Sequence, residues 1–354
     1  MPDSYPSKLT QFLYERYKFF SGDAGKGLII LPVELIENNG VKLKKYVLEL
    51  CKIWKLPSEF ITWINDACVF CSTLVDRIVT GYPYDEAEKI CESLGYTDNL
   101  LDVAEPFGLW VIESKKNISK DFPLDKAELP VIFTDNQNPY RERKVRILNG
   151  AHTSLVLLAW LAGDETVMEC MNDGLIRLFI EKCVNEGIKP FIALPENDIN
   201  IFVKTVFERF ENPFIKHKVL DISLNSVSKW KARVLPSFKD YYAEKGIIAP
   251  ALTFSFAALL AFYSSSEFDG TALKAKRADG TYYLIRGDES ALKFFAENSG
   301  KETGEYVRLA AENTDFWSEN LSLYNGFTES VVKYLTAIHN DARTAVSLFL
   351  KGEL

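Results

Sequence analysis

The spacing of apolar and polar residues divides the chain into two parts. Up to about residue 137, short apolar runs at 28–33, 109–113 and 129–133 predict buried strands, and helical periodicities alternate with them. Beyond residue 137, apolar residues recur every three or four positions almost to the end, which indicates helices. We predict these helices at 141–162, 165–185, 195–210, 216–231, 250–264, 288–298, 303–323 and 328–350.

One hairpin interrupts the helical part. Residues 274–285 contain Asp279-Gly280, a dipeptide that favours the two-residue turn of a β-hairpin. We therefore expect an α/β domain at 1–137, followed by a mostly α-helical domain at 138–354 that folds on its own core.

Composition and charge narrow the choice of partner. The net charge of -8 and the lack of basic runs argue against a nucleic-acid partner. The most apolar stretch, 246–264, is interrupted by Pro250 and Thr253, so it predicts a buried core helix rather than a membrane span. The first four residues are polar and lack the apolar region of a signal peptide, which favours a cytoplasmic protein.

The six cysteines do not form a metal-binding pattern. Cys68 and Cys71 make a CxxC pair, but no second pair or histidine cluster lies at zinc spacing. We interpret the cysteines as buried free thiols, which suits a reducing compartment, and we predict no metal site.

Candidate chemistry lies between Lys144 and His152. In a regular helix of ~100° per residue, Asn149 lies about 140° and His152 about 80° from Lys144. An amine, an amide and an imidazole on one broad face suit carbonyl chemistry. The alternative interpretation is a solvated helix face with a satisfied core histidine.

This segment resembles a known signature. Asn138 to His152 is similar to the Lys-x4-Asn-x2-His motif of the mannitol dehydrogenase family of long-chain polyol dehydrogenases. Further family-like runs follow one order along the chain, at 31–40, 71–80, 110–113, 212–217 and 225–230. The resemblance implies part of a Rossmann-type NAD-binding domain, followed by a helical domain like the C-terminal domain of 6-phosphogluconate dehydrogenase.

The resemblance also implies a reaction, namely reversible hydride transfer between NADH and the ketone of a hexuronate. Lys144 would exchange the proton, with its pKa lowered from ~10.4 towards 7–8 by burial and by Arg141, Arg143 and Arg146. The other implied roles are hydrogen bonds to the developing oxyanion from Asn149 and Asn39, a hydrogen bond to a substrate hydroxyl from His152, and carboxylate binding by His217, Lys229 and Arg233.

Two alternatives stay open. The substrate can instead be fructuronate or mannitol, because the Lys-x4-Asn-x2-His core does not discriminate among them. The chain can also be a non-catalytic helical fragment, because it begins at a point that resembles the inside of the family's first domain. No Gly-x-Gly-x-x-Gly follows a strand, so the cofactor-binding residues are unidentified and we expect weak NADH binding.

Overall fold

The computed structural model describes residues 2–354, and their contacts form two compact units. The first unit comprises the residues up to Ile78 together with Pro106–Arg141, and the second comprises Val79–Glu105 together with Glu142–Leu354. The boundary predicted after residue 137 lies four residues before this division. The sequence pattern did not predict that residues 79–105 leave the first unit and pack with the helical one.

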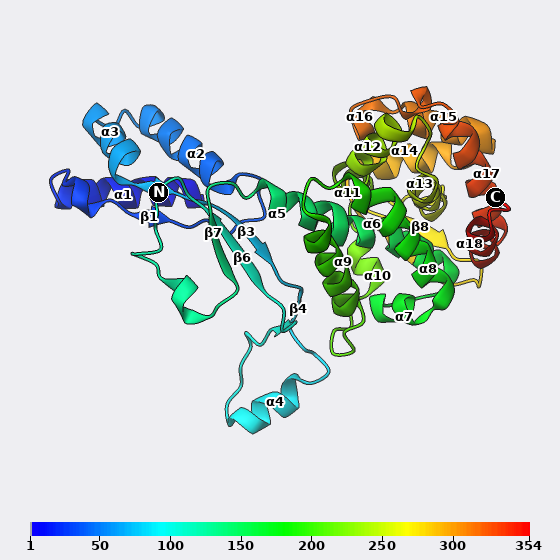
Figure 1. The fold of residues 1–354 in the computed structure, drawn as a ribbon, viewed down its shortest axis with the longest axis horizontal. Helices are drawn as coiled ribbons and strands as arrows, with labels where there is room; N and C mark the ends of the chain where they lie inside the picture. Colours follow the sequence, from blue (N-terminus) through cyan, green and yellow to red (C-terminus); the bar gives the residue numbers. More distant parts are fainter. Residues whose placement is uncertain (1) are drawn as a thin grey trace. The chain divides into compact units, whose positions relative to one another are not determined.

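Three helices and a pair of parallel strands make one core of the first unit (Figure 1). The helices are α1 (Tyr5–Phe19), α2 (Asn39–Ile53) and α3 (Ser58–Ala67), and the strands are β1 (Ile29–Ile30) and β2 (Val69–Phe70). Helix α1 begins where the Ser4 side chain accepts a hydrogen bond from the Ser7 amide and Pro6 fixes the first turn. Leu13, Val47 and Phe60 are fully buried at its centre.

A three-stranded sheet forms the rest of this unit. Its order is β3 (Ser72–Asp76), β6 (Leu109–Glu113), β7 (Val131–Thr134), with β3 antiparallel and β7 parallel to β6. The predicted strand 109–113 matches β6. The start of α2 lies directly against the chain between β2 and β3, because a Cβ on Gly40 would lie 2.0 Å from the Cys71 carbonyl oxygen. Glycine is therefore required there.

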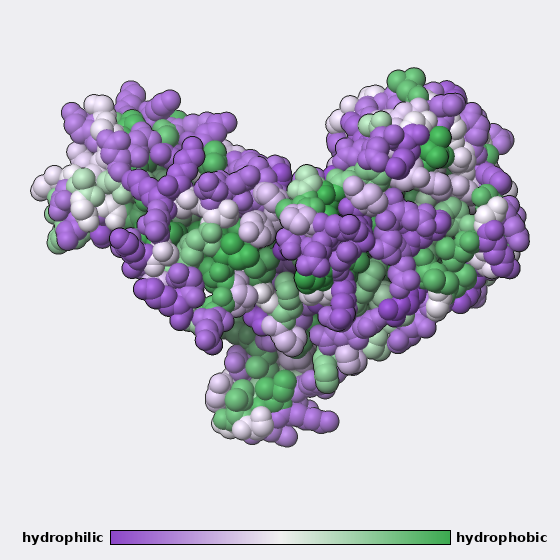
Figure 2. All heavy atoms as spheres, in the orientation of Figure 1, coloured by the Kyte–Doolittle hydropathy of each residue, from purple (hydrophilic) through white to green (hydrophobic). Residues whose placement is uncertain are grey.

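Residues 79–105 form a small excursion from the sheet. Strands β4 (Val79–Gly81) and β5 (Val103–Ala104) pair antiparallel at its base, and α4 (Ala87–Leu94) lies between them along the chain. Figure 2 shows apolar atoms on the visible face around α4. Tyr84, Tyr96 and Leu100 are exposed in this segment.

The second unit is helical and has one continuous core. Twelve of the 13 residues of α13 (Pro250–Phe262) are buried, and α13 packs against α6 (Gly150–Ala162) and α17 (Phe327–Asn340). The predicted core helix at 250–264 is thus confirmed. The remaining helices are α7 (Val167–Asn172), α8 (Gly174–Lys182), α9 (Glu196–Phe210), α10 (Val219–Ser223), α11 (Ser226–Arg233), α12 (Leu235–Lys245), α14 (Glu289–Asn298), α15 (Thr303–Glu312), α16 (Thr314–Trp317) and α18 (Ala342–Lys351).

The helical unit differs from the sequence prediction in several places. The helix expected at 165–185 is divided at Asp173 into α7 and α8, and the helix expected at 303–323 is divided at Asn313 into α15 and α16. The helix expected at 216–231 is divided into α10 and α11, because Asn225 takes a left-handed conformation. Helix α12 was not predicted, and Pro236 stands in its first turn, where proline is compatible with a helix. The hairpin is confirmed as β8 (Leu273–Lys276) and β9 (Tyr282–Ile285).

One helical stretch in the described chain is long and apolar enough to cross a membrane. It is Asn138–Ala162, and 83% of its most apolar window is buried inside the protein. It includes α6, which lies in the core of the helical unit.

Candidate functional site

The segment with the candidate chemistry is a π-helical turn within one long helix. Helix α5 (Asn138–Arg143) passes into the π turn η3 (Lys144–Asn149), which passes into α6. The amide of Gly150 donates to the carbonyl of Val145, five residues earlier. π turns are rare and are often found at functional sites.

The π turn corrects the geometry expected of a regular helix. A hydrogen bond from residue i+5 to residue i widens the turn, so side chains five positions apart project from more similar directions than in an α-helix. Lys144 and Asn149, both half-buried, are related in this way. The amine and the amide therefore project from more similar directions than the roughly 140° separation of an α-helix.

Gly150 allows another helix to approach the end of this turn. A Cβ on Gly150 would lie 3.1 Å from the carbonyl oxygen of Arg233, which ends α11. The Arg233 guanidinium in turn donates to the Thr153 hydroxyl at 3.4 Å. Two of the three residues predicted to bind a carboxylate, Lys229 and Arg233, are carried by α11 against α6.

His152 is buried with an unpartnered ring nitrogen. Its ring stacks on Phe210 with centroids 4.1 Å apart and meets the edge of His217 at 5.3 Å. Its Nε2 has no hydrogen-bond partner among residues 2–354. Burial, and then the nearby His217 and Arg233, lower the pKa of His152 well below its usual value, so the imidazole is neutral at pH 7. A neutral imidazole can donate or accept one hydrogen bond at this atom, depending on its tautomer.

The predicted substrate residues lie within electrostatic reach of His152. His217, Lys229 and Arg233 all act on its pKa. Burial, followed by the charge of Arg233, lowers the pKa of Lys229 to about 8, while its Nζ donates to the Ile222 carbonyl at 2.8 Å. We call the cluster of His152, His217, Lys229 and Arg233 the cationic pocket, because Lys229 and Arg233 give it positive charge. These two half-buried cations suit a carboxylate ligand.

A buried ion pair beside this pocket was not found from the sequence. The Arg209 guanidinium donates from Nε and Nη2 to the Glu105 carboxylate over 2.8–3.1 Å. The two residues are 104 positions apart, so no local spacing could reveal the pair.

The arginines expected to lower the pKa of Lys144 have other partners. Arg141 pairs with Glu37 at 2.9 Å, and the Arg143 guanidinium lies 4.2 Å above the ring of Phe202. Arg146 is buried and its Nη1 pairs with Asp240 at 2.8 Å. Arg146 therefore fixes η3 to helix α12, which carries both Asp240 and Ser237, since its Nε also donates to the Ser237 hydroxyl.

Asn39 lies in the first unit, and its carboxamide binds the backbone. Nδ2 donates to the carbonyls of Pro32, Glu34 and Thr73 at 3.1–3.2 Å, and Oδ1 accepts from the amides of Gly40 and Thr73 at 2.9 Å. This geometry favours a structural role. Its role as an oxyanion donor stays a prediction.

Asn39→Ala should lower the free energy of unfolding by at least ~1–3 kcal/mol, because it leaves buried backbone groups without partners. Urea denaturation measures this change. Asn65→Ala, on the exposed side of α3, is the matched control. Unchanged stability with reduced turnover would instead favour the catalytic role.

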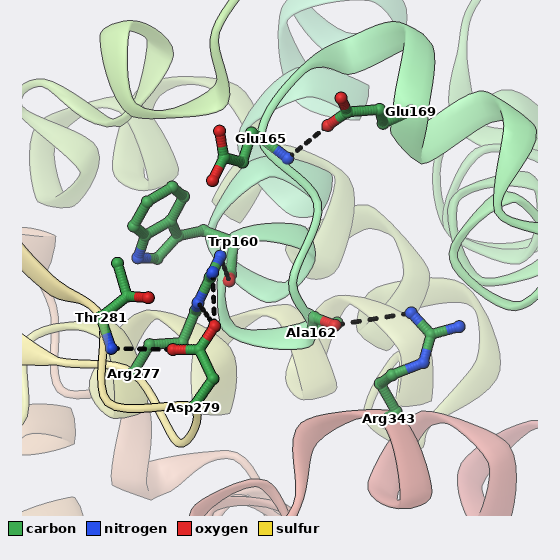
Figure 3. Close-up of polar contacts among 8 residues, drawn as sticks. All are labelled: Trp160, Ala162, Glu165, Glu169, Arg277, Asp279, Thr281 and Arg343. Carbon is green, nitrogen blue, oxygen red and sulfur yellow. Dashed lines mark hydrogen bonds and ion pairs between the residues drawn. The ribbon is translucent and has the colours of Figure 1, made fainter.

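Two arginines hold the far end of α6 (Figure 3). Arg277 donates to the Trp160 carbonyl and Arg343 to the Ala162 carbonyl, each at 3.4 Å. Asp279 in turn pairs with Arg277 at 2.6 Å. Cations at a helix C-terminus bind its free carbonyls and interact favourably with its dipole. The helix that carries His152 is therefore anchored at its other end.

The part of the chain that the structure describes places no three His, Cys, Asp or Glu side chains where they could hold a metal ion. All six cysteines are free thiols, and five are buried.

Comparison with known proteins gives matches along nearly the whole chain. Residues 3–126 match the mannitol dehydrogenase Rossmann domain, and residues 136–339 match the mannitol dehydrogenase C-terminal domain. The altronate oxidoreductase of Pectobacterium atrosepticum is 43% identical over 98% of this chain and 71% of its own length. That of Escherichia coli O139:H28 is 42% identical over 95% of this chain and 68% of its own.

Solved structures show the same fold. The chain superimposes on Pseudomonas fluorescens mannitol 2-dehydrogenase, solved in a ternary complex with NAD and D-mannitol, with a TM-score of 0.74. Identity is 21%, and the match covers 99% of this chain and 67% of the dehydrogenase. A substrate-free D-sorbitol dehydrogenase also gives a TM-score of 0.74, at 19% identity over 98% and 66% of the two chains.

Proposed function

The chain belongs to the mannitol dehydrogenase family, and from this premise we propose that it is an NAD-dependent altronate oxidoreductase, which interconverts tagaturonate and altronate. Relatives with that name are 42–43% identical over most of the chain. Its six free thiols favour action in the cytoplasm.

The cationic pocket is the observation that carries this proposal. A neutral polyol offers only hydroxyl groups, whereas a hexuronate also offers a carboxylate. Lys229 and Arg233 are half-buried cations close to a neutral imidazole, so they can bind a carboxylate while His152 binds a hydroxyl. This combination favours a sugar acid over a neutral sugar.

Lys144 and Asn149 of the π turn, and His152 of α6, can each take a separate task in ketone reduction. Negative charge develops on the ketone oxygen, and the Asn149 amide can donate a hydrogen bond to it. The Lys144 ammonium supplies the proton to that oxygen, and in the reverse direction the free amine takes it from the alcohol. His152 Nε2, left without a protein partner, orients a neighbouring hydroxyl.

The described residues fit only part of a nicotinamide dinucleotide. Parallel strands are present, but among residues 2–354 no glycine-rich turn joins a strand to the N-terminus of a helix, which is how such folds hold the pyrophosphate. The loop after β1 instead leads to Gly40, and the Cys71 backbone occupies the position that a Cβ on Gly40 would take. We therefore expect a KM for NADH above the usual ~1 µM–1 mM range.

A substrate panel tests the proposed function. NADH oxidation is followed at one fixed NADH concentration with D-tagaturonate, D-fructuronate and D-fructose. We expect kcat/KM for tagaturonate to exceed that for fructose by at least ~100-fold, because fructose leaves the buried cations unpaired. Preference for fructose would indicate a mannitol dehydrogenase, and preference for fructuronate would indicate the other sugar-acid reaction of the family.

The KM for tagaturonate should rise as the pH rises through about 8, the pKa of Lys229. Below that pH Lys229 carries a charge that binds the carboxylate, and above it the charge is lost. We expect a rise of roughly 10-fold, as for one charge-assisted hydrogen bond. Kinetics between pH 7 and pH 9.5 measure it. Lys229→Met should have a high KM without this pH dependence, and an unchanged profile would exclude Lys229 from substrate binding.

A further inference from the structure

The excursion at 79–105 ends by placing a carboxylate inside the helical unit. The Glu105 side chain is 1% exposed, directly after β5, and the Arg209 side chain is 5% exposed near the end of α9. Two guanidinium nitrogens donate to this carboxylate. Because a charge buried without a counter-ion is strongly unfavourable, each member of the pair requires the other.

The pair is connected to the cationic pocket by contact and by charge. Arg209 is followed by Phe210, the residue on which the His152 ring stacks at 4.1 Å. Glu105 acts on His217 and raises its pKa, against the lowering effect of burial. Arg209 acts on His152 and lowers its pKa. The pair therefore lies within electrostatic reach of both imidazoles.

We propose that Glu105, acting through Arg209, is a positioning residue for the cationic pocket. By fixing Arg209 it holds Phe210 against His152 and so sets the plane of the imidazole that binds the substrate hydroxyl. By neutralising Arg209 it confines the positive charge available to a ligand to Lys229 and Arg233. The confinement of positive charge to Lys229 and Arg233 matters only if the substrate is the proposed sugar acid. The electrostatic effect of Glu105 on His217 does not depend on the substrate.

The same excursion provides a matched control. Lys216 donates to Asp85 at 3.0 Å, and these side chains are 75% and 78% exposed. This ion pair also connects the excursion to the segment after α9, and its lysine, Lys216, directly precedes His217 in the chain. Because solvent screens an exposed pair, Asp85→Asn should have little effect where Glu105→Gln has a large one.

Histidine titration tests the charge coupling. The groups that act on His217 are Asp221, Glu105 and Lys229, and the His152 ring meets its edge. The chain has only three histidines, so NMR of ¹⁵N-labelled imidazoles can resolve each one. His339, which lies 3.2 Å from the Ser264 hydroxyl, is the internal reference.

Glu105→Gln should lower the pKa of His217, because it removes a carboxylate that favours the protonated ring. Glu105→Asp keeps the charge and should retain most of the wild-type value, and Asp85→Asn should leave it unchanged. His339 should titrate alike in every variant. An unchanged His217 titration in Glu105→Gln would overturn the proposal, whether or not the protein turns over tagaturonate.

Kinetics test the positioning. The double variant Glu105→Gln/Arg209→Met removes both charges of the pair together, so it should fold even if Glu105→Gln alone does not. We expect its kcat with tagaturonate to fall about 100-fold, as for a small misplacement of a reacting group, with the thermal midpoint nearly unchanged. Asp85→Asn should keep wild-type kcat. A stable double variant with wild-type kcat would overturn the proposal.

Discussion

Lys144→Ala should lower kcat for tagaturonate reduction by at least ~100-fold, with little change in thermal stability. Lys144 is half-buried at the start of the π turn, where its side chain projects from a direction closer to that of Asn149 than it would in an α-helix. Removing the amine removes the proton donor for the developing alkoxide. Steady-state kinetics and a thermal melt measure the two quantities.

The controls separate proton transfer from a general loss of positive charge. Lys204→Ala removes an exposed lysine of α9 that pairs with Glu208 at 3.7 Å, and it should keep wild-type kcat. Added methylamine or ethylamine should partly restore Lys144→Ala, because a free amine can carry the missing proton. Wild-type turnover in Lys144→Ala would exclude this lysine from the mechanism.

Asn149→Ala should lower kcat by roughly 100- to 1000-fold while the KM for tagaturonate changes little. The amide is expected to bind the oxygen more strongly as negative charge develops on it, so its loss raises the barrier more than it weakens the ground state. Initial rates over a range of substrate concentrations separate the two parameters.

Asn200→Ala is the matched substitution, because Asn200 is exposed on α9. It should leave both parameters unchanged. A raised KM with unchanged kcat in Asn149→Ala would show that Asn149 positions the ground-state substrate. The two outcomes therefore distinguish oxyanion stabilisation from simple binding.

The sequence predicted those elements whose signal is local. Strand 109–113 and helix 195–210 follow from apolar periodicity, and the hairpin around Asp279-Gly280 follows from its turn residues. The π turn was missed because apolar spacing does not distinguish one i, i+5 bond from α-helical bonds. Helix α12 was missed because Pro236 looks like a helix breaker unless it stands in a first turn.

The candidate site residues also differ in whether a local sequence signal marks them. Lys144, Asn149 and His152 were suggested by their spacing and then favoured by family resemblance, whereas His217, Lys229 and Arg233 came from family resemblance alone, and the roles of all six stay predictions. The Glu105–Arg209 pair escaped both, since nothing local marks a glutamate before Pro106 as the counter-ion of an arginine in α9. Asn39 was assigned to chemistry because of its loop, but its hydrogen bonds show a set of backbone contacts that sequence cannot display.

The excursion at 79–105 also makes the helical unit discontinuous along the chain. The expectation that residues after 137 fold alone therefore changes, because a fragment of 142–354 lacks the Glu105 carboxylate that Arg209 binds in the core, and breaking a buried pair costs about 3–5 kcal/mol. During synthesis, Glu105 leaves the ribosome 104 residues ahead of Arg209, a delay of roughly 5–20 s. The growing chain must keep that carboxylate in water until α9 emerges, so the order of translation requires this part of the helical core to close late.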